Sequence, residues 1–111
     1  MLAGRLLNLP FMILYNVTTS LEPQIADEWV AYMLNHHMAE VVGTGCFINS
    51  QLLRLLNEED DGITYAAQYF AVSLEQLDAY QEHFAPALRE EMDRKFKGNY
   101  VSFRTTLEVV S

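Results

Sequence analysis

Cysteines, basic residues and long apolar runs are all scarce in this chain of 111 residues. Cys46 is the single cysteine, so no disulfide can form within the chain, and we expect a reducing compartment. Seven Lys and Arg stand against fifteen Asp and Glu, and the net charge of −8 argues against nucleic acid and anionic membranes as partners. No apolar run approaches the roughly 20 residues of a transmembrane helix, and residues 1–11 lack the features of a signal peptide. These absences predict a cytoplasmic protein.

Two hydrophobic periods alternate along the chain in a defined order. The period of two residues that is typical of strands occurs in residues 12–19, 46–56, 61–72 and 100–110. The helical period occurs in residues 23–38 and 73–97. The order is therefore βαββαβ, which predicts an α+β, ferredoxin-like fold: a four-stranded antiparallel sheet with two helices on one face.

The length and the local signals predict one domain over residues 12–111. Residues 1–11 match neither period, so we expect them to be an N-terminal extension without fixed structure, with Met12 as the natural start. The alternative is a short arm that packs on a partner subunit. Within the second helix, Pro86 removes one backbone hydrogen bond and predicts a kink or break after Phe84.

The alternation of residues along each strand assigns side chains to two sheet faces. In the last strand we place Val101, Phe103 and Leu107 under the helices, and Arg104 with Glu108 on the helix-free face. That face also receives a set of apolar residues from the other strands: Met12, Leu14, Phe47, Leu53, Leu55 and Phe70. In water they would form an unusually large apolar patch. We therefore expect two such sheets to face each other in a homodimeric α+β barrel.

Several polar residues stand among these apolar ones and are the candidates for a ligand pocket or an interface: Asn16, Gln51, Gln68, Arg104 and Glu108. Charges that face such an interior need partners. Arg104 is expected to contact Glu108 of the partner subunit, the amide oxygens of Asn16 or Gln68, or a bound anion. The set marks either a polar pocket between the two sheets or an interface salt bridge.

Three further features could carry chemistry, and each also has an ordinary structural explanation. His37, three residues before Glu40, is either an oriented base or a histidine that interacts with the helix dipole. Cys46 is expected to be a core residue, because a helix C-terminus beside it does not favour a thiolate. The acidic run 58–61 lacks the alternating ligand spacing of a calcium loop, and no metal site is predicted.

Beyond the βαββαβ order, the chain resembles a family of bacterial proteins known as DUF4286. The resemblance extends from residue 12 to residue 109 and rests on Trp29 and six segments: residues 12–18 (MILYNVT), 37–41 (HMAEV), 44–47 (TGCF), 64–70 (TYAAQYF), 84–88 (FAPAL) and 103–109 (FRTTLEV). It implies the dimeric α/β-barrel superfamily in fold and carries no established activity.

That superfamily includes cofactor-independent monooxygenases and haem-degrading enzymes. The haem-degrading members pair a Trp on the strand before the second helix with a His on that helix. His83 lies on the second predicted helix, but strand 61–72 contains no Trp, so haem degradation does not carry over and no cofactor is predicted.

The prediction is thus a small homodimer that binds a small molecule between its two sheets, or uses those sheets only as an interface. The alternative is a cofactor-independent oxygenase or isomerase that uses Asn16, Gln68, Arg104 and His37. The sequence leaves open whether the protein is an enzyme.

Overall fold

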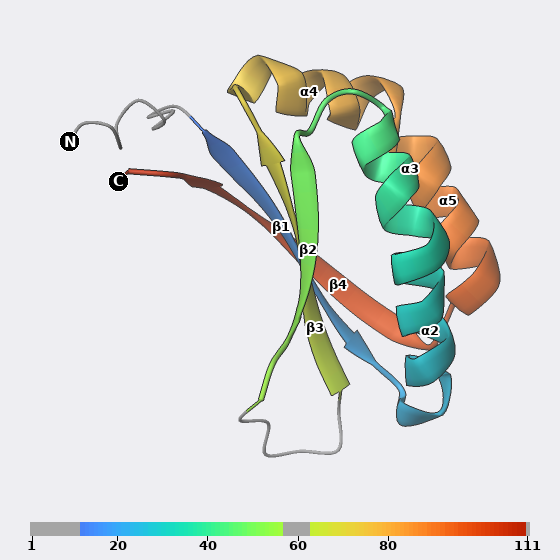
Figure 1. Ribbon diagram of the computed structural model, residues 1–111. Helices are drawn as coiled ribbons and strands as arrows, with labels where there is room; N and C mark the ends of the chain where they lie inside the picture. The colour runs from blue at the N-terminus through green and yellow to red at the C-terminus, as the bar shows by residue number, and fades with distance from the viewer. Residues whose placement is uncertain (1–11, 57–62, 111) are drawn as a thin grey trace.

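The computed structural model describes residues 12–56 and 63–110, and within them the predicted order of elements is confirmed (Figure 1). Four strands form one antiparallel sheet in the order β2-β3-β1-β4. Their bounds are β1 (Ile13–Leu21), β2 (Asn49–Arg54), β3 (Ile63–Ala71) and β4 (Tyr100–Glu108). The predictions for residues 1–11 and for the acidic run 58–61 lie outside the described residues.

The first helical region begins as predicted and ends later. It consists of η1 (Pro23–Ile25), α2 (Ala26–Tyr32), the π-helical turn η2 (Met33–His37) and α3 (Met38–Gly43). Residues 39–42 contain no helix breaker, so the helix continues past Met38 to Gly43. Gly45 then adopts a positive φ of 86°, which a residue without a β-carbon tolerates best. The π turn widens the helix in its middle, a feature that often accompanies functional sites.

The second helical region is divided where Pro86 predicts a break. The helix α4 (Leu74–His83) and the helix α5 (Ala85–Phe96) are separated at Phe84. The hydroxyl of Ser73 accepts a hydrogen bond from the backbone N–H of Gln76 at 3.1 Å and caps the start of α4. Among the described residues no helix is long and apolar enough to span a membrane.

All helices cover the same face of the sheet, and the core lies between the two layers (Figure 1). An aromatic cluster holds them together, with Phe47 at 4.9 Å from Tyr80 and 5.5 Å from Tyr69 between ring centroids. The prediction that Phe47 lies on the helix-free face is wrong: β2 begins at Asn49, so strand alternation does not extend to it. Cys46 is a buried free thiol in this core, as expected.

The pairing of β4 with β1 corrects the predicted orientation of the last strand. Tyr15 lies opposite Thr106, and Val17 lies opposite Arg104. Residues directly opposite each other in a sheet share a face, and Tyr15 belongs to the core beneath the helices. Arg104 therefore faces the helices, whereas the apolar residues of β4 lie on the helix-free face and are exposed: Val101, Phe103 and Leu107.

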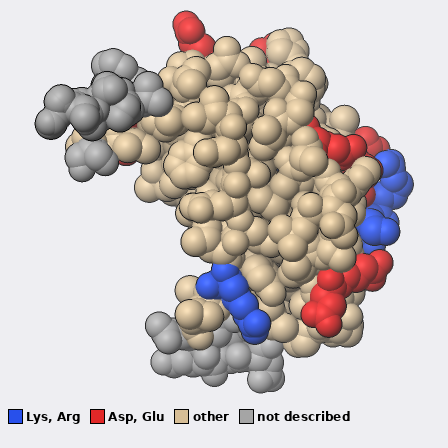
Figure 2. Space-filling model, in the orientation of Figure 1, with Lys and Arg blue, Asp and Glu red and all other residues tan. Residues whose placement is uncertain are grey.

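The corrected helix-free face carries no charged residue in any of the described strands. It consists of apolar, amide and hydroxyl side chains: Leu14, Asn16, Thr18, Ser20, Asn49, Gln51, Leu53, Thr64, Ala66, Gln68, Phe70, Val101, Phe103, Thr105 and Leu107. In the view of Figure 2, most of the charged side chains gather over the helices instead. The acidic residues of the described helices thus lie away from this side of the sheet.

Candidate functional site

A small cavity lies between the sheet and the helices, with a volume of about 40 Å³. That volume has room for roughly three water molecules or for a group of similar size. Its walls come from β1, β3 and β4 and from α2, η2, α4 and α5. Several of the lining side chains are polar: Tyr15, Thr19, His37, Tyr80, Arg89, Ser102 and Arg104. Arg104 is the exposed member of the lining, so the cavity reaches the surface beside it.

Two guanidinium groups converge on the hydroxyl of Tyr15. Arg89 of α5 donates to this oxygen at 3.0 Å, and Arg104 of β4 donates to it at 3.1 Å. Tyr15 itself is almost completely buried, and Arg89 is further held by the side-chain oxygen of Gln81 at 2.7 Å. The arrangement fixes two positive groups from different elements at one end of the cavity.

His37 reaches the cavity from the π-helical turn. Its ring stacks on that of Tyr32, with centroids 5.6 Å apart, and the side chain is buried. Burial lowers the pKa of His37 to about 4, against an opposing effect of Glu91 and a smaller lowering by His36. The imidazole is therefore neutral at pH 7. Its Nδ1 atom is buried and has no hydrogen-bond partner among the described residues.

Trp29 of α2 forms another wall and carries a second unpartnered polar atom. The side chain is 1% exposed, and its ring packs on Tyr65 at 5.6 Å. The indole Nε1 is buried without a hydrogen-bond partner within the described part of the chain. Buried donors of this kind are nearly always satisfied in folded proteins. Of the four buried polar side-chain atoms without a partner in the described part of the chain, this N–H and the Nδ1 of His37 belong to residues that line the cavity, whereas Tyr32 and Glu40 do not line it.

Three tyrosines of the cavity have raised pKa values and are neutral near pH 7. Burial is the main reason that the pKa of Tyr80 rises to about 12, and burial also raises the pKa of Tyr69 well above its usual range. The hydroxyl of Tyr100 donates to the carboxylate of Asp93, and burial together with this bond raises the pKa of Tyr100. The positive charge at the cavity therefore comes from Arg89 and Arg104.

The structure divides the residues that the sequence proposed as one site. Asn16, Gln51 and Gln68 do come together, on the helix-free face. Gln51 donates to Gln68 at 2.8 Å, and Gln68 donates to Asn16 at 3.1 Å. Arg104 and His37 lie on the opposite side of the sheet, at the cavity.

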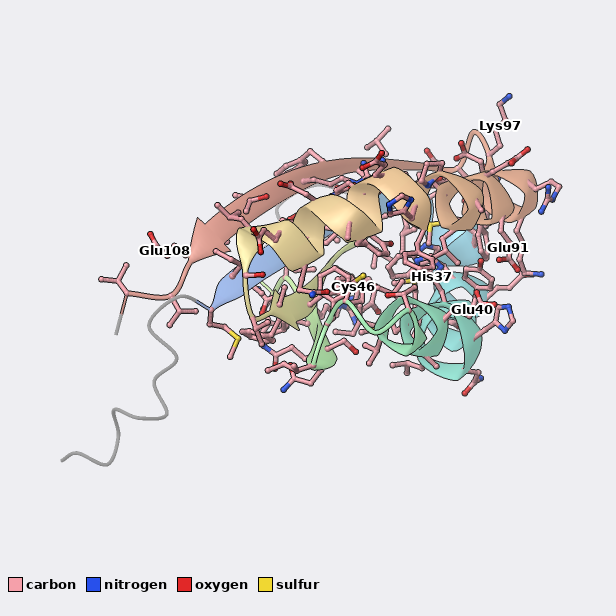
Figure 3. The ribbon with its side chains drawn as sticks, turned by 90° about the horizontal axis from the view of Figure 1, so that it is seen from above. His37, Glu40, Cys46, Glu91, Lys97 and Glu108 are labelled. Carbon is pink, nitrogen blue, oxygen red and sulfur yellow. The ribbon has the colours of Figure 1, made fainter. Side chains whose placement is uncertain are left out.

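Glu108 belongs to neither group. It lies opposite Ile13 at the end of β4, on the helix side, far from His37 in Figure 3. The predicted contact of Arg104 with Glu108 of the partner subunit assumed that both residues lie on the helix-free face, and this placement is wrong. The predicted contact of Arg104 with Asn16 or Gln68 fails for the same reason, because the sheet separates them.

Of the two alternatives for His37, orientation by Glu40 is not seen, because Glu40 contacts the neighbouring histidine. His36 Nε2 lies 3.5 Å from Glu40 Oε2 and 3.3 Å from Glu91 Oε2. These three side chains gather between α3 and α5, and their ligand-type atoms lie within 4.8 Å of one another (Figure 3 labels both carboxylates). They could hold a metal ion in principle. Their partial exposure and mutual ion pairs already explain the arrangement.

Sequence reasoning did not single out Arg89 or Trp29 as a candidate site residue. A signal for Arg89 is present in the helical spacing. It stands four residues after Ala85 and seven before Phe96, both of which are buried. A basic residue on the buried side of an amphipathic helix indicates either an internal partner or a site.

The sheet order, the helices on one face and the internal cavity define a ferredoxin-like α+β domain. The chain belongs to the family described as domain of unknown function (DUF4286), whose model matches residues 12–110. A comparison with curated proteins finds no significant relative.

Solved structures share the fold at low sequence identity. A heme-degrader, MhuD of Mycobacterium tuberculosis, is 18% identical with a TM-score of 0.67, covering 89% of this chain and 96% of that one. A variant of SnoaB, a cofactor-independent oxygenase of Streptomyces nogalater, is 10% identical with a TM-score of 0.64 and coverages of 90% and 94%. A dimeric ferredoxin-like protein from an uncultured marine organism is 14% identical with a TM-score of 0.53 and coverages of 90% and 97%.

Proposed function

We propose that this protein binds a small molecule in the cavity between its sheet and its helices, and that it does so as a homodimer. The observation that carries the binding function is the pair of buried, unpartnered polar atoms at one cavity, Trp29 Nε1 and His37 Nδ1. A bound molecule with complementary donor and acceptor groups would satisfy both, at a cavity whose other walls combine tyrosine rings with aliphatic and polar side chains.

The homodimer rests on the helix-free face. Val101 is 71% exposed and Phe103 is 63% exposed in the single chain, next to further apolar residues of the same face. An uncharged sheet face of this composition is typical of a surface that another sheet covers. A second copy of the chain supplies a matching face, and one solved structure of the same fold is described as dimeric.

In this proposal the ligand and the dimer contact lie on opposite sides of the sheet. The sequence placed the ligand between the two sheets, but the cavity lined by Arg104 and His37 is on the helix side. The amide chain from Gln51 through Gln68 to Asn16 therefore belongs to the interface, where its internal hydrogen bonds satisfy part of the amide groups that burial would otherwise leave without partners.

An oxygenase or isomerase remains the alternative. Its proposed residues were Asn16, Gln68, Arg104 and His37, which the sheet now divides into two pairs on opposite faces. The division removes the argument that these four act together. Binding requires only the groups at the cavity, so it is the function that the geometry supports better.

Trp29 provides a direct test of binding because it is the single tryptophan of the chain. Its indole N–H gives one resonance in a proton–nitrogen NMR spectrum of the full chain. Benzoate, benzamide and benzyl alcohol serve as small planar probes. We expect at least one of them to shift this resonance in a saturable manner at millimolar concentration. An indole signal that none of the three probes moves would contradict the proposed site.

A further inference from the structure

We infer that the cavity contains an anion-binding subsite in which Arg89 and Arg104, with Tyr15 between them, receive the carboxylate of a small ligand. This inference rests on the proposed function and names the class of ligand that the cavity accepts. Its evidence is the geometry and the charge of one end of the cavity.

The first observation is the convergence of two like charges. Arg89 and Arg104 come from α5 and β4, and both donate to the same oxygen of Tyr15, at 3.0 and 3.1 Å. Two guanidinium groups that donate to the same oxygen atom lie close enough to repel each other. This repulsion is stronger where the protein excludes part of the solvent. An anion bound beside them would offset this repulsion, whereas a neutral ligand would leave it in place.

The second observation is that no carboxylate among the described residues neutralises the two guanidinium groups. Neither Arg89 nor Arg104 forms an ion pair with a described residue. Asp93 accepts a hydrogen bond from Tyr100 instead, and Glu91 contacts His36. The chain has fifteen acidic residues for seven basic ones. Two unpaired guanidiniums at one cavity are therefore not explained by a shortage of acids.

The third observation is the supply of unused donors. A guanidinium has five N–H donors, and Arg104 uses one of them on Tyr15 while Arg89 uses its Nη2 group on Tyr15 and Gln81. The other N–H groups remain for a planar, two-oxygen acceptor, which a carboxylate provides. Tyr15 accepts two hydrogen bonds, and no described residue accepts from its own O–H, so this proton can be donated to the ligand as well.

The dimensions favour a carboxylate on a planar body. The cavity of about 40 Å³ holds a group of carboxylate size, and the exposed position of Arg104 leaves room for the remainder of a larger ligand to extend outward. The aromatic rings of Trp29, Tyr69 and Tyr80 line the same space and offer flat apolar walls. Benzoate is therefore a suitable probe, and benzamide is its neutral counterpart of nearly the same shape.

The test measures dissociation constants of benzoate and benzamide with the full chain, using the Trp29 indole resonance for occupancy. We expect benzoate to bind at least about tenfold more tightly, because hydrogen bonds between two charged groups are roughly twice as strong as those of a neutral acceptor. In Arg89→Met and Arg104→Met the preference should fall to about twofold or less, since each removes one of the two cations. Arg94→Met is the matched control: it removes an exposed cation from the same helix, away from the cavity, and should keep the full preference.

The outcomes separate the two proposals. Equal affinity for benzoate and benzamide would overturn the anion subsite and leave the binding function intact. Equal loss of preference in Arg94→Met would also overturn it, because the effect would then be one of net charge. Failure of benzoate, benzamide and benzyl alcohol alike to move the indole signal would overturn the binding function and this inference with it. Arg104→Lys keeps the test valid if Arg104→Met does not fold. It retains the positive charge and should preserve part of the preference for benzoate over benzamide.

Discussion

Val17 and Arg104 lie directly opposite each other on the antiparallel strands β1 and β4. Residues in this position share a sheet face, and Val17 lines the cavity beneath the helices. The guanidinium therefore faces the cavity, and Phe103, one residue earlier, faces the other way. The register of β4 on β1 therefore places the positive charge of Arg104 at the cavity, in addition to that of Arg89. The same register leaves no charged residue of the described strands on the helix-free face.

The homodimer predicts a defined response to a charge on the helix-free face. Phe103→Lys should convert a dimer of about twice the 12.7 kDa chain mass into a monomer, because the new ammonium would be buried without a partner at the contact. Phe103 is already 63% exposed in the single chain, so the monomer itself should remain folded. Sedimentation equilibrium at micromolar concentration measures the change.

The control for that variant is Leu34→Lys. Leu34 is 60% exposed, but it lies on the helical layer rather than on the sheet. This substitution should leave the dimer intact. A wild-type chain that sediments as a monomer would contradict the proposed interface, as would equal dissociation by both substitutions.

The amide chain on the helix-free face predicts a second effect on the dimer. Gln68→Leu removes the group that accepts from Gln51 and donates to Asn16. Both remaining amides would then be buried in the dimer without this partner, and the dimer should weaken by about 1–3 kcal/mol. Thr105 lies on the same face, and its side chain forms no hydrogen bond with another described side chain. The substitution Thr105→Val should therefore weaken the dimer much less. Dissociation constants from dilution experiments distinguish the two.

A larger side chain in the cavity tests whether the probes bind there. Ala67→Val adds two methyl groups at a residue that lines the cavity, so the free energy of unfolding should change by less than about 1 kcal/mol while probe binding is lost. Ala71→Val makes the same change at a fully buried residue of the same strand outside the cavity. It should destabilise the fold by about 1–3 kcal/mol through overpacking. Urea unfolding would contradict the assignment if Ala67→Val were the more destabilising.

The order of elements could be predicted from the sequence because each signal is local. The strand and helix periods, the Ser73 cap and the break before Pro86 all depend on neighbouring residues. The orientation of β4 could not be obtained in the same way. Alternation separates two sets of side chains, but the choice of which set faces the helices depends on the pairing with β1. The more apolar set, with Phe103, was assigned to the helices, whereas it lies on the helix-free face.

The candidate site was predicted only in part for related reasons. His37 was recognised, but adjacent helical residues differ by about 100° in direction, and it is His36 that faces Glu40. Arg89 is recognised as a site residue through its hydrogen bond to Tyr15, and this contact joins residues that are far apart in the sequence. Phe47 was misplaced because it precedes the first residue of β2, where the alternation of the strand does not yet apply.

The buried imidazole of His37 predicts a loss of stability on acidification. Burial lowers its pKa from 6.5 to about 4 in the folded state. Between these two values the unfolded chain binds the proton and the folded chain does not, so the free energy of unfolding rises with pH in this window. As the pH falls from 7 to 4, the contribution of His37 should destabilise the fold by up to about 3 kcal/mol.

His37→Gln isolates that contribution, since the carboxylates of the chain titrate in the variant as in the wild type. Glu91 and His36 are the titratable neighbours of the imidazole, and they act on its pKa in opposite directions. His36→Gln is the control, because His36 is exposed and pairs with Glu91 at the surface. Urea unfolding at a series of pH values should show a smaller acid loss in His37→Gln than in the wild type or in His36→Gln. Parallel curves for all three proteins would show that His37 is protonated in the fold as readily as in the unfolded chain, and that its burial beside the cavity does not keep it neutral.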